Sequence, residues 1–304
     1  MSSPGPAAGP DPAAGSPERV EIPVGELVFD ALAAGPPDGE LVLLLHGFPQ
    51  SSWEWRAQLP ALAQAGYRAV APDQRGYSPR ARPEGTEHYR SDHLVADVIA
   101  VADWLGGHRV HLVGHDWGGL VAWRLASRYP ERVRTLTAVS VPHPLAVAEA
   151  LASPSGDQVA RSAYIAFFQR AELPERLLLA EEGAGLRALF ANTGYHDREA
   201  MERYVSLLLE PGALTAALSW YRNLDLSWAT DMGPVTVPTL FVWSTEDPAL
   251  GGEAAEACGR YVAGPYRFEV LDGVGHWIPE DAPDALNRLL LEHLSSSPDR
   301  TGGT

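Results

Sequence analysis

The stretch 112–119 carries a carboxylate in a position from which it could act as a nucleophile. The stretch 109–113 is rich in apolar and β-branched residues, which indicates a short buried strand, and apolar residues recur from Leu120 at helical spacing. In the pattern Gly-x-Asp-x-Gly, Asp116 therefore lies in a sharp turn between a strand and a helix, a nucleophile elbow. The N–H groups at the helix N-terminus favour a negative charge there. A carboxylate so placed could attack an electrophilic carbon and form an ester.

An aspartate at this place also has a plainer explanation, because Asp is a common N-cap residue of helices. The chemistry of an ester needs a histidine that activates water and an acid that orients the histidine. His276 lies in Gly-Val-Gly-His-Trp after the last predicted strand. Asp247 follows the strand predicted at 237–243, with Glu246 next to it as the alternative acid. The order nucleophile, acid, histidine is that of the α/β-hydrolase triad.

Hydrolysis of the ester also needs N–H donors for the oxyanion that forms at its carbonyl. One candidate is the backbone N–H of Trp117, directly after the nucleophile. The other comes from the loop His-Gly-Phe-Pro that ends an earlier strand, where Phe48 has an N–H and Pro49 has none. The alternative for this loop is an ordinary turn.

The hydrophobic pattern predicts the elements that position these residues. Apolar runs predict strands at 20–22, 27–32, 41–45, 67–72, 109–113, 133–141, 237–243 and 266–271, and helical spacing alternates with them. From 145 to 232 the pattern is helical throughout. We expect an α/β-hydrolase fold, a mostly parallel central sheet with helices on both faces and an inserted helical lid. The expected domains are a core at 19–144 and 233–294, a helical cap at 145–232, and disordered tails at 1–18 and 295–304.

The composition limits the class of protein. With 304 residues, 45% of them apolar, the chain can bury a large core. No apolar run approaches the length of a membrane span, and residues 1–18 lack the features of a signal peptide. A net charge of −16 argues against binding nucleic acid or an anionic membrane. The single cysteine, Cys258, excludes an intramolecular disulfide and a cysteine-based zinc site. We expect a cytoplasmic enzyme for neutral small molecules, without a metal or cofactor.

Six stretches, in this order along the chain, form a recognisable set. They are His-Gly-Phe-Pro at 46–49 with Trp53 and Trp55 after it, Asp-x-Arg-Gly-Tyr at 73–77, Gly-His-Asp-Trp-Gly-Gly at 114–119, Val-Pro-His-Pro at 141–144, Ser-Trp-Tyr-Arg-Asn at 219–223 and Gly-His-Trp at 275–277. Together they resemble the epoxide hydrolase family of the α/β-hydrolase superfamily. The resemblance spans residues 20–294, so it covers both the core and the lid.

The resemblance implies that two lid tyrosines hydrogen-bond the epoxide oxygen and protonate it as the ring opens. Tyr221 matches in its Trp-Tyr-Arg motif, and Tyr164 has the spacing expected before Phe-Phe-Gln at 167–169. The implied substrates are a hydrophobic epoxide and water, and the implied product is a vicinal diol formed through a hydroxyalkyl ester of Asp116. We expect the pocket to be lined by His46, Trp53, Phe167, Phe168, Trp220 and Trp277, together with Trp117.

Other readings of the same elbow remain as alternatives. A haloalkane dehalogenase shares the triad, and its halide is typically held by the tryptophan after the nucleophile, here Trp117, and by an Asn or Trp elsewhere. Dehalogenases that use an asparagine typically have it where Phe48 stands, and Phe48 has no side-chain donor. A fluoroacetate dehalogenase should have an arginine next to the nucleophile, where Trp117 stands. Serine esterases need a serine or cysteine in the elbow, which this chain lacks. A non-catalytic ligand-binding relative would normally have lost one of the triad positions, and all three are present.

Overall fold

The computed structural model of this chain describes residues 16–225 and 227–296. Residues 1–15 and 297–304, which make up most of the two predicted tails, lie outside the described residues. Glu18, the last residue of the first predicted tail, begins strand β1. Ser295, the first residue of the second, ends helix α14. The described fold therefore includes the inner edges of both predicted tails.

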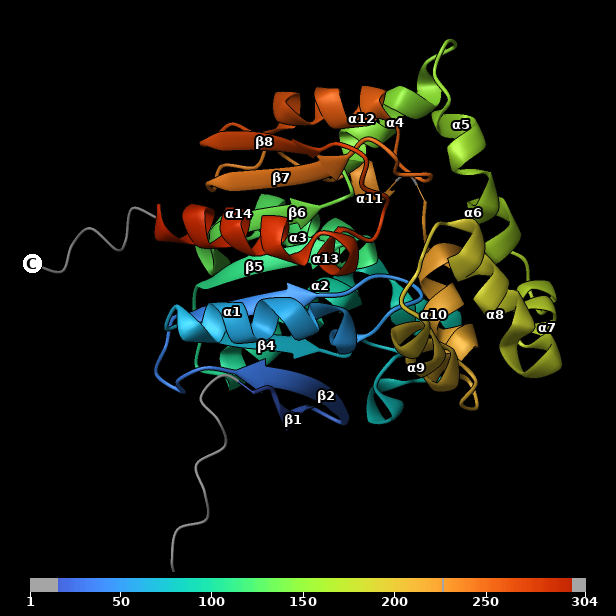
Figure 1. The fold of residues 1–304 in the computed structure, drawn as a ribbon, viewed down its shortest axis with the longest axis horizontal. Coiled ribbons are helices and arrows are strands. Elements are labelled where there is room, and N and C mark those ends of the chain that lie inside the picture. The colour runs from blue at the N-terminus through green and yellow to red at the C-terminus, as the bar shows by residue number, and fades with distance from the viewer. Residues whose placement is uncertain (1–15, 226, 297–304) are drawn as a thin grey trace, which may run out of the picture.

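The described residues form an eight-stranded sheet with the strand order β1-β2-β4-β3-β5-β6-β7-β8 (Figure 1). β1 and β2 are antiparallel to each other, β2 is antiparallel to β4, and the strands from β4 to β8 are parallel. β3 and β5 lie in the middle and are buried along their whole length, as expected for strands with helices on both faces. The strands are β1 (Glu18–Val24), β2 (Leu27–Ala34), β3 (Leu41–Leu45), β4 (Arg68–Pro72), β5 (Val110–His115), β6 (Val133–Val139), β7 (Thr239–Ser244) and β8 (Tyr266–Leu271).

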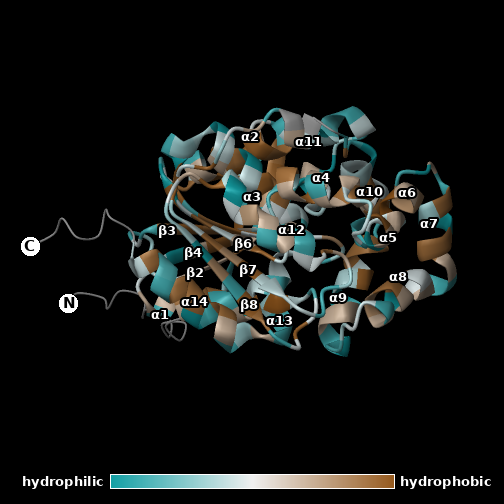
Figure 2. Cartoon of the chain, turned by 90° about the horizontal axis from the view of Figure 1, so that it is seen from above, coloured by the Kyte–Doolittle hydropathy of each residue, from teal (hydrophilic) through white to brown (hydrophobic). Residues whose placement is uncertain are grey.

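Helices cover both faces of this sheet. α1 and α14 pack on one face, and α2 and α3 pack on the other. The strands form a mostly apolar layer between them, whereas much of the outer helix surface is hydrophilic (Figure 2). The core helices are α1 (Gln58–Gln64), α2 (Ser91–Trp104), α3 (Trp117–Arg128), α12 (Gly252–Ala257), α13 (Ile278–Asp281) and α14 (Pro283–Ser295), and the short 3-10 helices lie at Ser52–Ala57, Pro79–Ala81, Thr86–Tyr89, Pro130–Arg132 and Cys258–Tyr261.

Between β6 and β7 the chain leaves the α/β alternation and forms a helical region, α5–α10, which lies beyond one end of the sheet (Figure 1). This is the α/β-hydrolase fold with an inserted helical lid, as the sequence predicts. α4, at the start of the predicted cap, packs against the core helix α12. The elements from α4 onward are α4 (Pro144–Ala152), α5 (Gln158–Arg161), α6 (Ala163–Phe168), α7 (Leu173–Leu178), α8 (Ala180–Asn192), α9 (Arg198–Leu208), α10 (Ala213–Arg222) and α11 (Ser227–Thr230).

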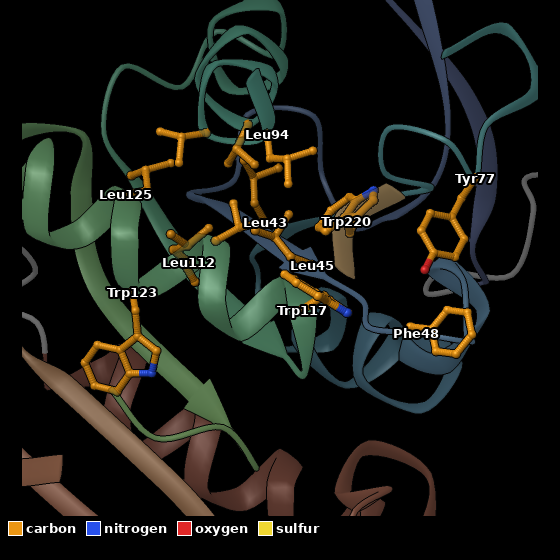
Figure 3. Packing of buried hydrophobic residues seen from close by; sticks show 14 of the residues in the cluster. Leu43, Leu45, Phe48, Tyr77, Leu94, Leu112, Trp117, Trp123, Leu125 and Trp220 are labelled. Carbon is orange, nitrogen blue, oxygen red and sulfur yellow. The ribbon is translucent and has the colours of Figure 1, made fainter. Parts of the chain in front are cut away.

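Apolar packing continues from the sheet to the loops that carry the predicted site. The rings of Trp117 and Trp220 lie next to Leu45 of β3, and Phe48 belongs to the same buried cluster (Figure 3). Trp117 and Trp220 contact each other edge to face, with 5.6 Å between ring centroids. The elbow and the lid helix α10 are therefore joined through the same buried cluster. None of the helices that the structure describes is long and apolar enough to cross a membrane.

Candidate active site

The turn between β5 and α3 holds Asp116 in a strained conformation. Asp116 has φ 49° and ψ −120°, a positive φ that side-chain-bearing residues rarely adopt. The turn is tight because the glycines around it lie against backbone. A Cβ on Gly118 would lie 2.1 Å from the Leu45 carbonyl oxygen, and one on Gly114 would lie 2.3 Å from the Gly118 oxygen. Glycine at both places lets the turn form, and the turn raises the Asp116 carboxylate above the end of the sheet.

His276 connects this carboxylate to the second acid. Its Nδ1 is 2.8 Å from Oδ2 of Asp247, and its Nε2 is 3.6 Å from Oδ2 of Asp116. The other oxygen of Asp247 accepts hydrogen bonds from the backbone N–H groups of Ala249 and Leu250, at 2.8 and 3.0 Å. Asp247 is therefore held on both oxygens, and it fixes which imidazole nitrogen faces Asp116.

The charges of this cluster shift the pKa values of its members. Burial lowers the pKa of His276, but the charges of Asp247 and Asp116 outweigh burial and raise it to about 10. Burial alone would raise the pKa of Asp116, but the interaction with His276 has the larger effect and holds the pKa of Asp116 below its usual range. Near neutral pH the site therefore holds an ionised Asp116 carboxylate beside an imidazolium.

The predicted oxyanion donors lie around the same carboxylate. The Phe48 N–H donates to Oδ1 of Asp116 at 2.8 Å. Trp117 is the first residue of α3, so its N–H is one of those that have no acceptor within the helix. The Trp117 indole, in turn, packs edge to face on the ring of Tyr221, with 4.9 Å between ring centroids. The backbone N–H groups of Phe48 and Trp117 are thus placed to donate to an oxyanion at the carbonyl of an Asp116 ester.

The two predicted lid tyrosines face this carboxylate. Tyr164 comes from α6 and Tyr221 from α10, and their ring centroids are 6.1 Å apart. Burial and the negative charge of Asp116 raise the pKa of both phenols. Both phenols line the same cavities as Asp116, so they can donate hydrogen bonds to a molecule bound there.

Comparisons with known proteins agree with this geometry. A family model described as alpha/beta hydrolase fold matches residues 40–283. Epoxide hydrolase A of Mycobacterium tuberculosis is 34% identical over 322 residues, covering 92% of this chain and 98% of the relative. The chain belongs to the epoxide hydrolase family. The AB hydrolase superfamily protein YfhM of Bacillus subtilis is 39% identical, covering 89% of this chain and 95% of the relative. A crystal structure of Bacillus megaterium epoxide hydrolase in complex with an inhibitor superposes with a TM-score of 0.83 at 29% identity, covering 91% of this chain and all of that one.

In this member of the epoxide hydrolase family, four of the seven residues predicted for the pocket line the cavities at Asp116. They are Phe167, Phe168, Trp277 and Trp117. Phe168 packs edge to face on Tyr221, with 4.9 Å between ring centroids. These aromatic rings make the wall of the cavity apolar on the side of α6 and of the His276 loop.

The structure places the other three, His46, Trp53 and Trp220, away from those cavities. The His46 ring is buried, where it accepts from the Gln74 N–H at 3.0 Å. Trp53 lies under the Arg203 guanidinium, 4.1 Å from its ring centroid, at a groove beside β1 and β2. Trp220 precedes Tyr221 on α10, so it faces the core instead, where its indole donates to the Arg75 carbonyl. Spacing alone could not show which side of its helix or loop each ring faces.

Sequence reasoning missed a buried acid beneath the triad. Glu54 is fully buried, and its Oε2 lies 3.3 Å from Nδ1 of His115, whose Nε2 is 3.0 Å from the His276 carbonyl oxygen. Burial raises the pKa of Glu54 well above its usual value and lowers that of His115 to about 4. Both are therefore neutral, with Glu54 donating to His115 and His115 donating to the His276 loop. The one signal in the sequence was a charged residue between two tryptophans at 53–55.

The His276 loop is held by further hydrogen bonds. The Ser140 hydroxyl donates to the His276 carbonyl at 2.7 Å, and the Ser244 hydroxyl donates to the Gly275 carbonyl at the same distance. Together with His115, these two hydroxyls fix the backbone that carries the His276 imidazole. Within residues 16–225 and 227–296, no group of three or more His, Cys, Asp or Glu side chains is arranged to hold a metal ion.

Proposed function

We propose that this chain hydrolyses apolar epoxides to vicinal diols through an ester of Asp116. The observation that carries the proposal is a carboxylate nucleophile with two lid phenols facing it across an apolar cavity. An alkoxide is a poor leaving group, and two phenol donors in an apolar site stabilise the charge that develops on it. Relatives and structures named as epoxide hydrolases support the same chemistry.

In the first step, a carboxylate oxygen of Asp116 forms a bond to one ring carbon. The bond from that carbon to the ring oxygen breaks, and its electron pair moves to the oxygen. Tyr164 and Tyr221 hydrogen-bond this oxygen, and a proton passes from a phenol to it. The product of this step is a neutral hydroxyalkyl ester of Asp116.

Formation of the ester changes what His276 can do. The negative charge of Asp116 is one of the causes that raise the pKa of His276, and esterification removes that charge. The pKa of His276 then falls. His276 gives its proton to the phenolate that the first step left, and the neutral imidazole can then act as a base. Asp247 keeps its Nδ1 protonated, so Nε2 is the atom that accepts a proton from water.

In the second step, a water molecule gives its proton to Nε2 of His276 and its oxygen attacks the carbonyl carbon of the ester. The oxyanion that forms is held by the N–H groups of Phe48 and Trp117. Its collapse breaks the acyl C–O bond, and the diol oxygen takes the proton from His276. Asp116 is then a carboxylic acid with one oxygen from water, and it gives its remaining proton to Nε2 of His276, which restores the carboxylate beside an imidazolium.

Trapping the ester tests this proposal. His276→Phe lacks the base for the second step, so treatment with styrene oxide should add the mass of one substrate molecule to the peptide that contains Asp116. Asp116→Ala, treated in the same way, should gain no mass. In the wild-type enzyme, one turnover in H2¹⁸O should place the label in Asp116, because the diol oxygen comes from the carboxylate. Label in the diol after that first turnover would contradict a covalent route.

A further inference from the structure

The loop that carries the second acid of the triad lies against the lid as well as the core. This acid loop, residues 247–251, follows β7 and begins with Asp247. On the core side, the Trp243 indole of β7 donates to the Leu250 carbonyl at 3.1 Å. On the other side, the loop meets the lid helix α5, which lies where the lid approaches the end of β7 (Figure 1).

The main contact from the lid is a buried glutamine of α5. Gln158 is 2% exposed, and its Nε2 donates to the Ala249 carbonyl at 2.8 Å and to the Ser162 hydroxyl at 2.9 Å. Its Oε1 accepts from the Gly251 N–H at 2.9 Å. One amide thus satisfies a carbonyl and an N–H of the acid loop, and it uses both of its own donor hydrogens and its acceptor.

An arginine one turn later on α5 binds the backbone of the acid itself. Nη1 of Arg161 donates to the Asp247 carbonyl at 2.5 Å. The guanidinium is held in this direction because its Nε pairs with Asp157, also at 2.7 Å on α5. The helix and the loop lie very close, since a Cβ on Gly251 would be 2.9 Å from an oxygen of Asp157. The lid therefore touches the backbone of the acid loop directly.

The same backbone positions the carboxylate that orients His276. The N–H groups of Ala249 and Leu250 hold one oxygen of Asp247, and the other oxygen is 2.8 Å from Nδ1 of His276. A shift of the loop therefore moves the carboxylate relative to the imidazole. Within the part of the chain that the structure describes, Gln158 lines neither of the cavities at Asp116, so it can affect the reaction only through the loop.

We propose that Gln158 and Arg161 are positioning residues that clamp the acid loop to the lid and thereby hold Asp247 against His276. This inference rests on the proposed ester mechanism. His276 acts as an oriented base only in the second step, whereas the first step uses Asp116 and the two lid phenols. Loss of the clamp should therefore slow hydrolysis of the ester and leave its formation unchanged.

Gln158→Met tests the clamp, because methionine keeps the length of the side chain and makes none of these hydrogen bonds. In single-turnover measurements with styrene oxide, hydrolysis of the ester should slow by roughly 10–100-fold, since a misplacement of about 1 Å can cost about 100-fold. Formation of the ester should keep its wild-type rate, so the ester on the Asp116 peptide should accumulate during turnover. Asn287→Leu is the control, because it removes a side-chain amide that donates to a core carbonyl, that of Ala57, at 3.2 Å. Both of its rates should be those of the wild type.

Arg161 provides a second test that does not depend on a buried substitution, since its side chain is 31% exposed. Arg161→Met removes the donor to the Asp247 carbonyl and should also slow hydrolysis of the ester. Arg161→Lys keeps a donor at this place and should restore most of the rate. Urea unfolding checks that each variant is folded.

The possible results separate the clamp from the proposed function. A wild-type rate of ester hydrolysis in a folded Gln158→Met or Arg161→Met variant overturns the clamp, and so does equal slowing of both steps. A lysine at 161 that restores nothing has the same meaning. In each of these cases an ester on Asp116 still supports the proposed function. If His276→Phe traps no ester on Asp116, the proposed function fails, and the clamp fails with it.

Discussion

At the scale of single residues, the chemistry depends on which proton donors face the nucleophile. Tyr221 is 3% exposed and packs against Phe48, Trp117 and Phe168, so its ring is held from several sides. Tyr164 is 36% exposed and lines both cavities. A packed ring and a donor hydroxyl are separable properties of these residues, since phenylalanine keeps the first and removes the second.

Tyr221→Phe should therefore fold normally and slow the formation of the ester. Loss of one donor to the developing alkoxide should lower the rate by roughly 10- to 1,000-fold. Tyr164→Phe should act in the same direction, and the double variant should be nearly inactive. Single-turnover measurements of ester formation with styrene oxide separate this step from the hydrolysis that follows. Normal ester formation in the double variant would show that the two hydroxyls serve only in packing.

Residue types and their order were enough to predict a part of this site. Asp116, His276 and Asp247 lie within one hydrogen-bonded cluster because each follows a parallel strand at the same edge of the sheet. Spacing could not place Trp53, because it lies at the start of the 3-10 helix Ser52–Ala57, whose period differs from that of an α-helix. Nor could it find Glu54, whose role depends on a contact with His115, 61 positions away.

At the scale of elements, the sequence pattern was most informative for strands. The strand predicted at 266–271 is β8, and the run at 41–45 is β3. Helical spacing was less precise. The helical spacing of the sequence at 252–261 corresponds to α12 followed by a 3-10 turn from Cys258, and the helical spacing at 53–65 corresponds to a 3-10 helix followed by α1. Apolar spacing over one turn does not distinguish the two hydrogen-bonding patterns, so such boundaries follow from tertiary packing.

The elbow gives an element-scale prediction about backbone packing. Gly118→Ala puts a Cβ 2.1 Å from the Leu45 carbonyl oxygen, so α3 must move away from β3. Overpacking against a backbone atom should cost about 3 kcal/mol or more of the free energy of unfolding. Gly233→Ala is the control, because a Cβ there meets nothing within 4 Å. Urea unfolding measures both variants, and equal stabilities would contradict the tight elbow.

At the scale of the whole molecule, one buried carboxylate joins the lid to the core. Glu280 of α13 has a side chain that is 2% exposed, and it accepts hydrogen bonds from the hydroxyls of Tyr195 and Tyr204 at 2.6 and 2.8 Å. Both tyrosines belong to the lid. Arg56, from the core, pairs with Glu280 and also with Asp197 at the start of α9. The position of α9, and of the loop that joins it to α8, therefore depends on contacts that converge on Glu280.

Glu280→Ala should loosen the lid without unfolding the sheet. The substitution leaves two buried hydroxyls without their acceptor and Arg56 without its buried partner. Removal of one member of a buried pair typically costs about 3–5 kcal/mol, and the effect here should be smaller because Arg56 is 24% exposed and keeps Asp197. We expect faster hydrogen exchange in α9, unchanged exchange in β5, and a lower kcat/KM for epoxides. Glu202→Ala is the control, since it removes from α9 itself a carboxylate that pairs with Arg187 at the surface. If exchange in α9 is the same in both variants, Glu280 does not anchor the lid.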